Sequence, residues 1–371
     1  LRSPAALAGA GLIADADRAG IEAAAATLPV AITPEMAALI DRHDPADPIA
    51  RQFVPDRREL EFAPAEGADP IGDGVHSPVK GIVHRHTDRV LLMPVMICPV
   101  YCRFCFRREA VGPGGGELDG AELEAALGYI RDHEEIWEVI LSGGDPLVLS
   151  PRRLGAIIEA LDRIDHVAAI RIHSRVPAVK PGRITAALVA VLQVETPVHV
   201  VLHCNHPREI TPAARRAIAA LVSAGIPMLG QTVLLKGVND DVETLSQLMR
   251  TLVQNRVTPY YLHHADLARG TAHFRTSLEA GRVLVRELRA RLSGLCQPTY
   301  VLDIPGGHGK VPVGPAYLME NETGDGWYVT DLDGVRHAYP PQGAQNDAAA
   351  LPRSGQADRF RRAKSAPADA S

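Results

Sequence analysis

The sequence carries few marks of a membrane, secreted or nucleic-acid-binding protein. None of its 371 residues belongs to an apolar run of the roughly 18 residues that a membrane-spanning helix needs. The apolar start, residues 1–10, has no basic stretch leading into a long apolar segment, so we expect no signal peptide. The formal net charge is −5, which gives no basic field for nucleic acid. We therefore expect a cytoplasmic protein with neither membrane nor nucleic acid as a partner.

Cysteine is also scarce, and its distribution is uneven. The chain has five cysteines, of which Cys98, Cys102 and Cys105 fall within eight residues, whereas Cys204 and Cys296 stand far away. An odd, clustered set of this kind is typical of a metal site and not of a disulfide framework. We interpret the two distant cysteines as packed core thiols.

Composition divides the chain into four regions. Residues 1–75 are alanine-rich with helical signals over 15–26 and 33–41, the second opened by a threonine cap and a proline. Residues 76–310 alternate short apolar runs with helical patterns, and 311–340 form a C-terminal segment. From 341 to 371 large apolar residues almost vanish, which predicts a disordered tail.

The middle region predicts an α/β fold. Alternating strands and helices of this length indicate right-handed crossovers and a parallel sheet that closes fully or partly into a barrel. The expected strands are 90–97, 138–141, 168–173, 198–203, 228–234, 259–263 and 299–302. The expected helices are 121–133, 152–164, 212–224, 242–254 and 278–292.

Polar side chains follow these strands, which is where chemistry collects in such barrels. They include Ser142, Gly143, Gly144, Asp145, His173, Ser174, His203, Asn205, His206, Gln231, Asp266, Asp303 and Lys310. Their convergence indicates a catalytic centre at the carboxyl ends of the strands.

The cysteine cluster has C-x3-C-x2-C spacing. Three thiolates can hold three irons of a [4Fe–4S] cubane and leave the fourth iron open, whereas electron-transfer clusters use four cysteines. Zinc is the competing interpretation, but it generally takes four ligands with paired spacings. With Phe104 directly before the last cysteine, the segment resembles the radical S-adenosylmethionine (SAM) superfamily. The resemblance implies a radical SAM partial (β/α) barrel, with SAM contacts at Gly143, Gly144, Asp145, Ser174, His203 and Gln231.

A glycine-rich loop ends in Lys310, and such a lysine can form a Schiff base with pyridoxal phosphate (PLP). On its own this loop is an ordinary turn more often than a cofactor site. Together with the stretches 84–89, 171–175, 203–211, 230–240 and 260–276, however, the chain is similar to the lysine 2,3-aminomutase family, collinearly from about 46 to 318.

This resemblance assigns roles to named residues. Lys310 is the lysine that binds PLP, and Arg85 and Arg89 lie near the PLP phosphate. Arg107 pairs with the substrate α-carboxylate. Asp266 and Asp303 hold the distal ammonium of the substrate, which agrees with the cost of burying two carboxylates without a cation.

The implied reaction interconverts L-lysine and L-β-lysine by 2,3-amino migration, as an isomerase that reuses SAM. A cellular one-electron reductant of the flavodoxin or ferredoxin type would serve as partner. The chain departs from longer family members because no cysteine follows Cys296 and Asp241 stands at the partner position, so we expect no zinc. The homo-oligomer that such zinc tails support is left open, as is the role of His308.

Several alternatives remain at this stage. The shorter relative that supplies β-lysine for elongation factor P modification resembles this chain in length, although Asp303 favours the free-lysine enzyme. An arginine-specific member also needs carboxylates, whereas a glutamate enzyme should have basic or neutral residues at 266 and 303. A non-catalytic iron–sulfur electron-transfer protein would leave Lys310, Arg107 and both aspartates unexplained.

Overall fold

The computed structural model describes residues 1–112 and 114–340 of the chain. The tail that the sequence predicts to be disordered, 341–371, lies outside the described residues. The chain divides into two compact units, Leu1–Pro315 and Ala316–Ser371. No helix among the described residues is long and apolar enough to cross a membrane.

The first unit is built on one nine-stranded sheet in the order of the chain, β1 to β9. Strands β2 to β8 are parallel, and β1 and β9 pair antiparallel at the two edges. Because β1 and β9 do not pair with each other, the barrel is partial, which confirms the predicted fold class. The strands are β1 Ile82–His86, β2 Arg89–Val95, β3 Glu138–Gly143, β4 Ala169–Ser174, β5 Val198–His203, β6 Met228–Leu234, β7 Val257–His264, β8 Thr299–Asp303 and β9 Lys310–Pro312.

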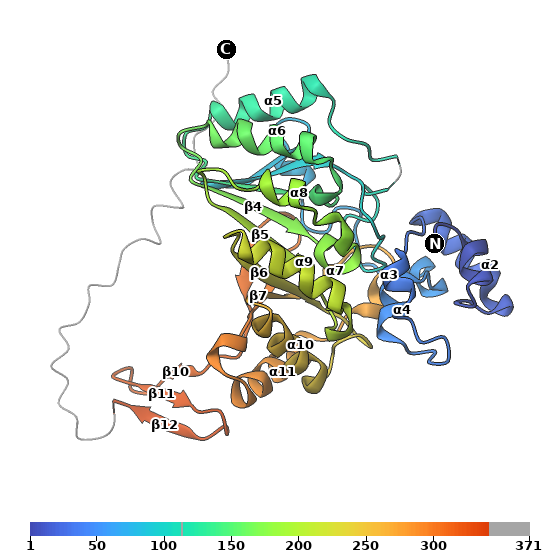
Figure 1. Cartoon of the computed structure of the whole chain (residues 1–371). Coiled ribbons are helices and arrows are strands. Elements are labelled where there is room, and N and C mark those ends of the chain that lie inside the picture. The colour runs from blue at the N-terminus through green and yellow to red at the C-terminus, as the bar shows by residue number, and fades with distance from the viewer. Residues whose placement is uncertain (113, 341–371) are drawn as a thin grey trace, which may run out of the picture. The chain divides into compact units, whose positions relative to one another are not determined.

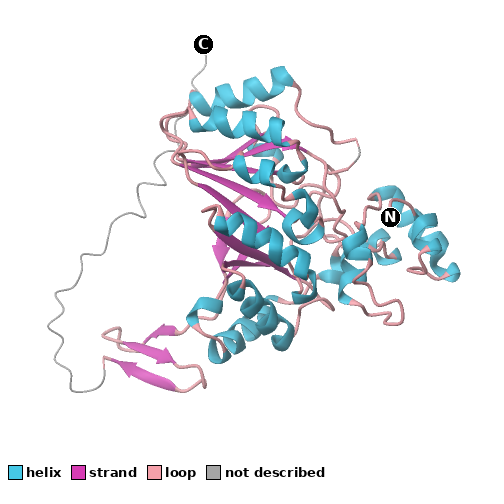
Figure 2. Cartoon of the chain, viewed as in Figure 1, coloured by secondary structure: helices cyan, strands magenta, loops and turns pink. Residues whose placement is uncertain are grey.

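Helices cover the outer face of this sheet (Figures 1 and 2). They occupy the crossovers between parallel strands, as βαβ units require. They are α5 Gly120–Arg131, α6 Pro151–Asp162, α7 Val176–Val179, α8 Ala186–Ala190, α9 Pro212–Ser223, α10 Val242–Gln254 and α11 Leu278–Arg291.

Side chains alternate between the two faces of the sheet, and this alternation shapes the inner face. On β4, Ile170 and Ile172 are fully buried, whereas Arg171 and His173 are only partly buried. Since neighbouring residues of a strand point to opposite faces, the isoleucines and the polar pair face opposite sides. One face thus packs in the apolar core and the other is lined by polar groups.

Before the barrel lie four short helices, α1 Pro4–Gly9, α2 Arg18–Thr27, α3 Pro34–Ala37 and α4 Pro48–Phe53. Thr33 caps α3 through a hydrogen bond from the Met36 amide, although α3 is a single turn and ends before residue 41. The second unit contains a three-stranded antiparallel sheet of β10 Leu318–Glu320, β11 Trp327–Thr330 and β12 Arg336–Tyr339.

Candidate active site

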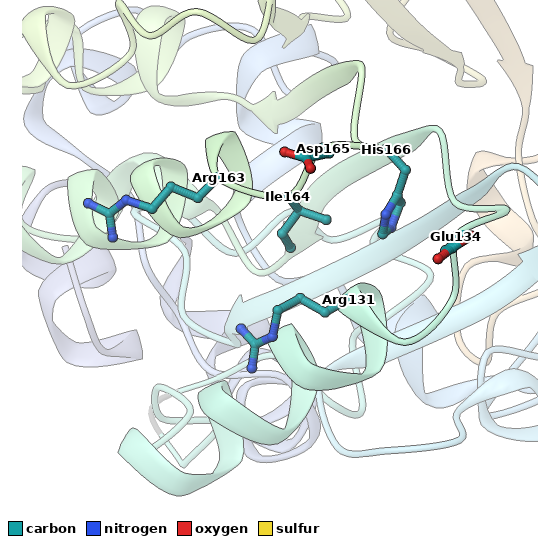
Figure 3. A pocket seen from close by; sticks show the side chains of 6 residues that line it. All are labelled: Arg131, Glu134, Arg163, Ile164, Asp165 and His166. Carbon is teal, nitrogen blue, oxygen red and sulfur yellow. The ribbon is translucent and has the colours of Figure 1, made fainter.

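A surface depression lies far from the polar inner face described above. It is lined by Arg131, Glu134, Arg163, Ile164, Asp165 and His166 (Figure 3). These residues belong to the segments that precede β3 and β4, so they stand at the amino ends of the strands. The candidate catalytic residues instead follow the strands at the opposite end.

The three clustered cysteines lie on the loop that follows β2. None forms a disulfide, and all three are partly buried. Burial, with smaller contributions from Asp145 and the other two thiols, raises the pKa of Cys98 well above its usual range, and burial raises the pKa of Cys105 to about 12. The thiols are therefore close enough to affect one another. Iron binding would remove their protons, because the thiolate is the ligand.

A glycine turn after β3 packs against the start of this loop. The amides of Gly144 and Asp145 donate to the carbonyls of Val95 and Ile97, at 2.7 and 3.0 Å. A Cβ at Gly144 would lie 2.4 Å from the Ile97 oxygen, so only glycine allows this approach. The turn therefore fixes where the cysteine loop begins.

Asp145 connects the turn after β3 with the turn after β4. Its buried carboxylate accepts from the Ser174 hydroxyl at 2.7 Å and from the amides of Arg175 and Leu147 at 2.8 and 3.1 Å. Burial raises the pKa of Asp145 despite these bonds. Asp145 and Ser174 thus bond each other and join the ends of β3 and β4.

The other two predicted SAM contacts, His203 and Gln231, stand opposite each other on β5 and β6. The His203 ring bonds Asn205 Oδ1 at 3.1 Å and lies edge-on to Phe104. Burial lowers the pKa of His203 well below its usual range, so the ring is neutral.

An ion pair joins the predicted PLP lysine to one predicted substrate aspartate. Lys310 opens β9 and pairs with Asp303 at the end of β8, and its Nζ contacts Asp303 Oδ2. His263 Nδ1 lies 3.8 Å from the same oxygen. Burial opposes ionisation of Asp303, but His263 and Lys310 together lower its pKa below its usual range. Asp303 is therefore ionised.

Asp266 lies in the same electrostatic environment but behaves in the opposite way. Burial and the nearby Asp303 charge raise the pKa of Asp266 to about 7, although Lys310 and Arg107 act in the other direction. Its Oδ1 atom is buried and has no partner among the described residues. Among the described residues no cation bonds this oxygen, and a ligand ammonium would supply one.

Asp73 joins two of the predicted anion-binding arginines. Its Oδ2 accepts from Nε of Arg107 at 2.8 Å, and its Oδ1 accepts from Nη2 of Arg85 at 3.1 Å. Arg107 Nη1 also lies 3.4 Å from the Ser142 hydroxyl. Asp73 thus holds both Arg85, which is predicted to lie near the PLP phosphate, and Arg107, which is predicted to bind the substrate carboxylate.

Arg89 is not brought to this group. It begins β2, at the amino end of the strand, and its guanidinium pairs with Asp88 at 2.7 Å. Its predicted place near the PLP phosphate stays a prediction.

Sequence reasoning did not identify Asp73 as a functional residue. It lies in no recognised motif, and its partners Arg85 and Arg107 are 12 and 34 residues away. His263 lies in the stretch 260–276 that resembles the family, but the resemblance assigns it no role. The sequence feature that could have identified His263 is its position just before the end of a strand. It shares a face of that strand with Tyr261, two residues earlier.

Comparison with known proteins decides the family. The radical SAM superfamily profile matches residues 92–249, and the lysine-2,3-aminomutase profile matches 285–363. The L-lysine 2,3-aminomutase of Clostridium subterminale is 42% identical over 86% of this chain and 77% of its own length. That of Acetoanaerobium sticklandii is 44% identical over 81% of this chain and 72% of its own. The chain belongs to the lysine 2,3-aminomutase family. A glutamate 2,3-aminomutase of Clostridioides difficile is 37% identical over 79% of this chain and 69% of its own.

Members of the lysine 2,3-aminomutase family use a [4Fe–4S] cluster, SAM and PLP, and the residues present fit these groups. Three free thiols on one loop match a cubane with one open iron. The Lys310 charge acts on Asp266, His263 and His173. Their buried atoms Asp266 Oδ1, His263 Nε2 and His173 Nε2 have no partner within the part of the chain that the structure describes. Native proteins rarely leave buried polar atoms unpaired, so these atoms are suited to bind a polar ligand.

Proposed function

We propose that this chain interconverts L-lysine and L-β-lysine by moving an amino group between C2 and C3. The observation that carries the proposal is the pair of buried carboxylates, Asp266 and Asp303, in electrostatic reach of Lys310 and Arg107. A diamino acid has a carboxylate for the arginine and a distal ammonium for the aspartates, which matches this charge pattern.

Each residue has a separate task in this proposal. Arg107 binds the substrate carboxylate, and Asp73, 2.8 Å from its Nε and Nη2 atoms, holds the guanidinium in place. Asp266 and Asp303 bind the distal ammonium and so fix how deeply the substrate enters. Cys98, Cys102 and Cys105 hold the cluster. When bound, the three cofactors supply hydrogen-atom abstraction and a carrier for the migrating amino group.

Lys310 Nζ contacts Asp303 in the structure. Lys310 would hold PLP, and Asp303 would then be available to the distal ammonium of the substrate, the kind of cation that a buried carboxylate needs.

Glutamate is the main rival substrate, because a glutamate 2,3-aminomutase is among the relatives. Its second carboxylate would face Asp266 and Asp303, and like charges in a buried site repel strongly. Arginine carries a distal cation and is the second rival.

The test is product formation by the full chain, reconstituted anaerobically with iron, sulfide and PLP. SAM, a reductant and L-lysine are added, and β-lysine is sought by mass spectrometry after derivatisation, with arginine and glutamate in parallel. We expect β-lysine from the wild type and none from Cys102→Ala or Lys310→Ala. As the matched control, Cys296→Ala should keep activity, because this thiol precedes β8 and so stands before the amino end of the strand. SAM cleavage without any β-lysine would contradict the substrate assignment.

The electron for the cluster has to come from outside the chain. We propose a reductant of the flavodoxin or ferredoxin type, and a cytoplasmic setting in which such carriers operate. Replacing the chemical reductant by each carrier in the same assay tests this proposal. Activity with neither carrier would contradict it.

A further inference from the structure

Arg175 forms a hydrogen bond with one of the clustered cysteines. Its guanidinium follows β4, is buried, and donates through Nη1 to Cys102 Sγ at 2.9 Å. The same group lies 5.0 Å from the Phe53 ring and 5.7 Å from the Phe104 ring. A buried guanidinium is costly unless other buried groups pair with it.

Two further buried side chains hold this guanidinium in place. Nη2 donates to Gln52 Oε1 at 3.0 Å and to Glu209 Oε2 at 2.5 Å. Gln52 Nε2 in turn donates to the other Glu209 oxygen at 3.1 Å. Gln52 and Glu209 are fully buried, so solvent does not screen the charges.

Glu209 is itself fixed by the backbone. Its Oε1 accepts from the amides of Asn205 and His206, at 3.0 and 2.9 Å, directly before the short 3-10 helix Pro207–Glu209 that Glu209 ends. The position of its negative charge is therefore set independently of Arg175. The positive charge of Arg175 is thus held in contact with Cys102 Sγ, and the negative charge of Glu209 is held on the other guanidinium nitrogen of Arg175.

We propose that Arg175 raises the reduction potential of the cluster through its hydrogen bond to Cys102, and that the negative charge of Glu209 partly offsets this effect. The inference rests on the proposed assignment of Cys102 as a cluster ligand. Reduction adds one electron to the oxidised cluster, with no bond broken and no proton taken up, so the cluster becomes more negative by one charge. A cation that donates to a ligand sulfur stabilises the reduced form and raises the potential, and an anion nearby lowers it.

The test is a mediator titration of the reconstituted full-length protein at fixed pH without SAM, monitored by electron paramagnetic resonance. Arg175→Gln should shift the potential to more negative values because it removes the cation. Glu209→Gln should shift the potential the other way, because it removes the anion and keeps an acceptor for both amides. Iron content and circular dichroism are measured on each variant.

Arg131→Gln is the matched control, since it removes one positive charge at the end of α5, before the amino end of β3, and should leave the potential unchanged. Opposite shifts in the two variants support the inference, since a purely structural role would not give opposite signs. A full cluster with the wild-type potential in both variants overturns the inference alone. If Arg175→Gln does not retain iron, the sign of the Glu209→Gln shift decides. A wild-type chain that binds no cluster overturns the proposed function as well.

Discussion

Asp266 and Asp303 are neighbouring buried carboxylates with opposite protonation behaviour. Asp303 has Lys310 as a partner and a lowered pKa, whereas the pKa of Asp266 is raised to about 7 by burial and by Asp303. An acid with a pKa near neutrality changes charge in the range where the enzyme is assayed. One carboxylate of the pair is therefore ionised near neutral pH, and the second becomes available to bind a cation only when Asp266 ionises.

Lysine binding should weaken as the pH falls below 7. The distal ammonium needs ionised Asp266, and at pH 6 only about a tenth of a group with pKa near 7 is ionised. We expect the dissociation constant of lysine from the PLP-loaded protein to rise about tenfold between pH 8 and pH 6. Difference absorption spectra of PLP would measure it. An analogue without the distal amino group is the control, and an equal response to pH from both ligands would contradict the prediction.

The same shifts predict opposite effects of two isosteric variants on stability. Burial and Asp303 raise the folded-state pKa of Asp266 from its ordinary value of 3.8 to about 7, so folding carries a cost that builds up between these two pH values and is fully present above pH 7. At pH 8, Asp266→Asn should raise the free energy of unfolding by roughly 1–3 kcal/mol. Asp303→Asn should lower it, because a depressed pKa stabilises the fold above the unfolded value.

Denaturant unfolding of the ligand-free variants at pH 8 and pH 5 checks both signs. The gain from Asp266→Asn should be smaller at pH 5, where the folded wild type is protonated, and should vanish only below about pH 3.8, where the unfolded chain is protonated as well. Destabilisation by Asp266→Asn at pH 8 would contradict the prediction.

The resemblance predicted both aspartates and Lys310 as site residues, and the structure brings them together. It could not predict Asp73, because a single aspartate in a loop resembles many helix caps and turn residues. Only three-dimensional contacts with Arg85 and Arg107 distinguish it. The sequence likewise contained no sign that Arg175 would reach Cys102, which is 73 residues away.

At the scale of the elements, the glycine turn after β3 should control the cysteine loop. Gly144→Ala would place a Cβ 2.4 Å from the Ile97 carbonyl oxygen, so the loop must move. We expect a loss of about 1–3 kcal/mol in unfolding free energy and reduced iron retention after reconstitution. Gly182→Ala is the control, because an added Cβ there has no neighbour within 4 Å. Wild-type iron content in Gly144→Ala would contradict the prediction.

The parallel strands could be predicted closely from the sequence, because each is a short apolar run between helical patterns. The edge strands β1 and β9 were not predicted. Both are short, antiparallel and adjacent to charged or glycine-rich segments. Their pairing depends on the already formed neighbours β2 and β8, which is information that a local pattern does not contain.

At the scale of the whole molecule, the N-terminal helices hold the cysteine loop. Arg103, between two of the cysteines, is fully buried and donates to Glu59 at 2.8 Å and to the carbonyl of Leu28 at 2.8 Å. The Arg103 amide donates to the Gln52 carbonyl at 2.9 Å. Composition predicted that the N-terminal residues are helical, but it gave no indication of these contacts, which span more than 40 residues of sequence.

Glu59 is the centre of this attachment, since it also pairs with Arg108 at 2.5 Å, and both arginines are buried. Glu59→Gln would leave two buried cations without a charge partner. Breaking a buried ion pair costs about 3–5 kcal/mol, so we expect a loss of that order in unfolding free energy. Because Arg103 lies beside Cys102, iron retention should fall as well, even under conditions where most of the chain is folded.

The matched control is Glu124→Gln, which breaks the exposed pair with Arg131 and should change the free energy by less than about 1 kcal/mol. Denaturant unfolding measures both variants, and iron content after gel filtration reports the loop. A Glu59→Gln variant that loses stability but keeps wild-type iron would separate the two roles, because the N-terminal helices would then stabilise the barrel without holding the cysteine loop. If Glu59→Gln loses both stability and iron, the N-terminal helices do hold the cysteine loop.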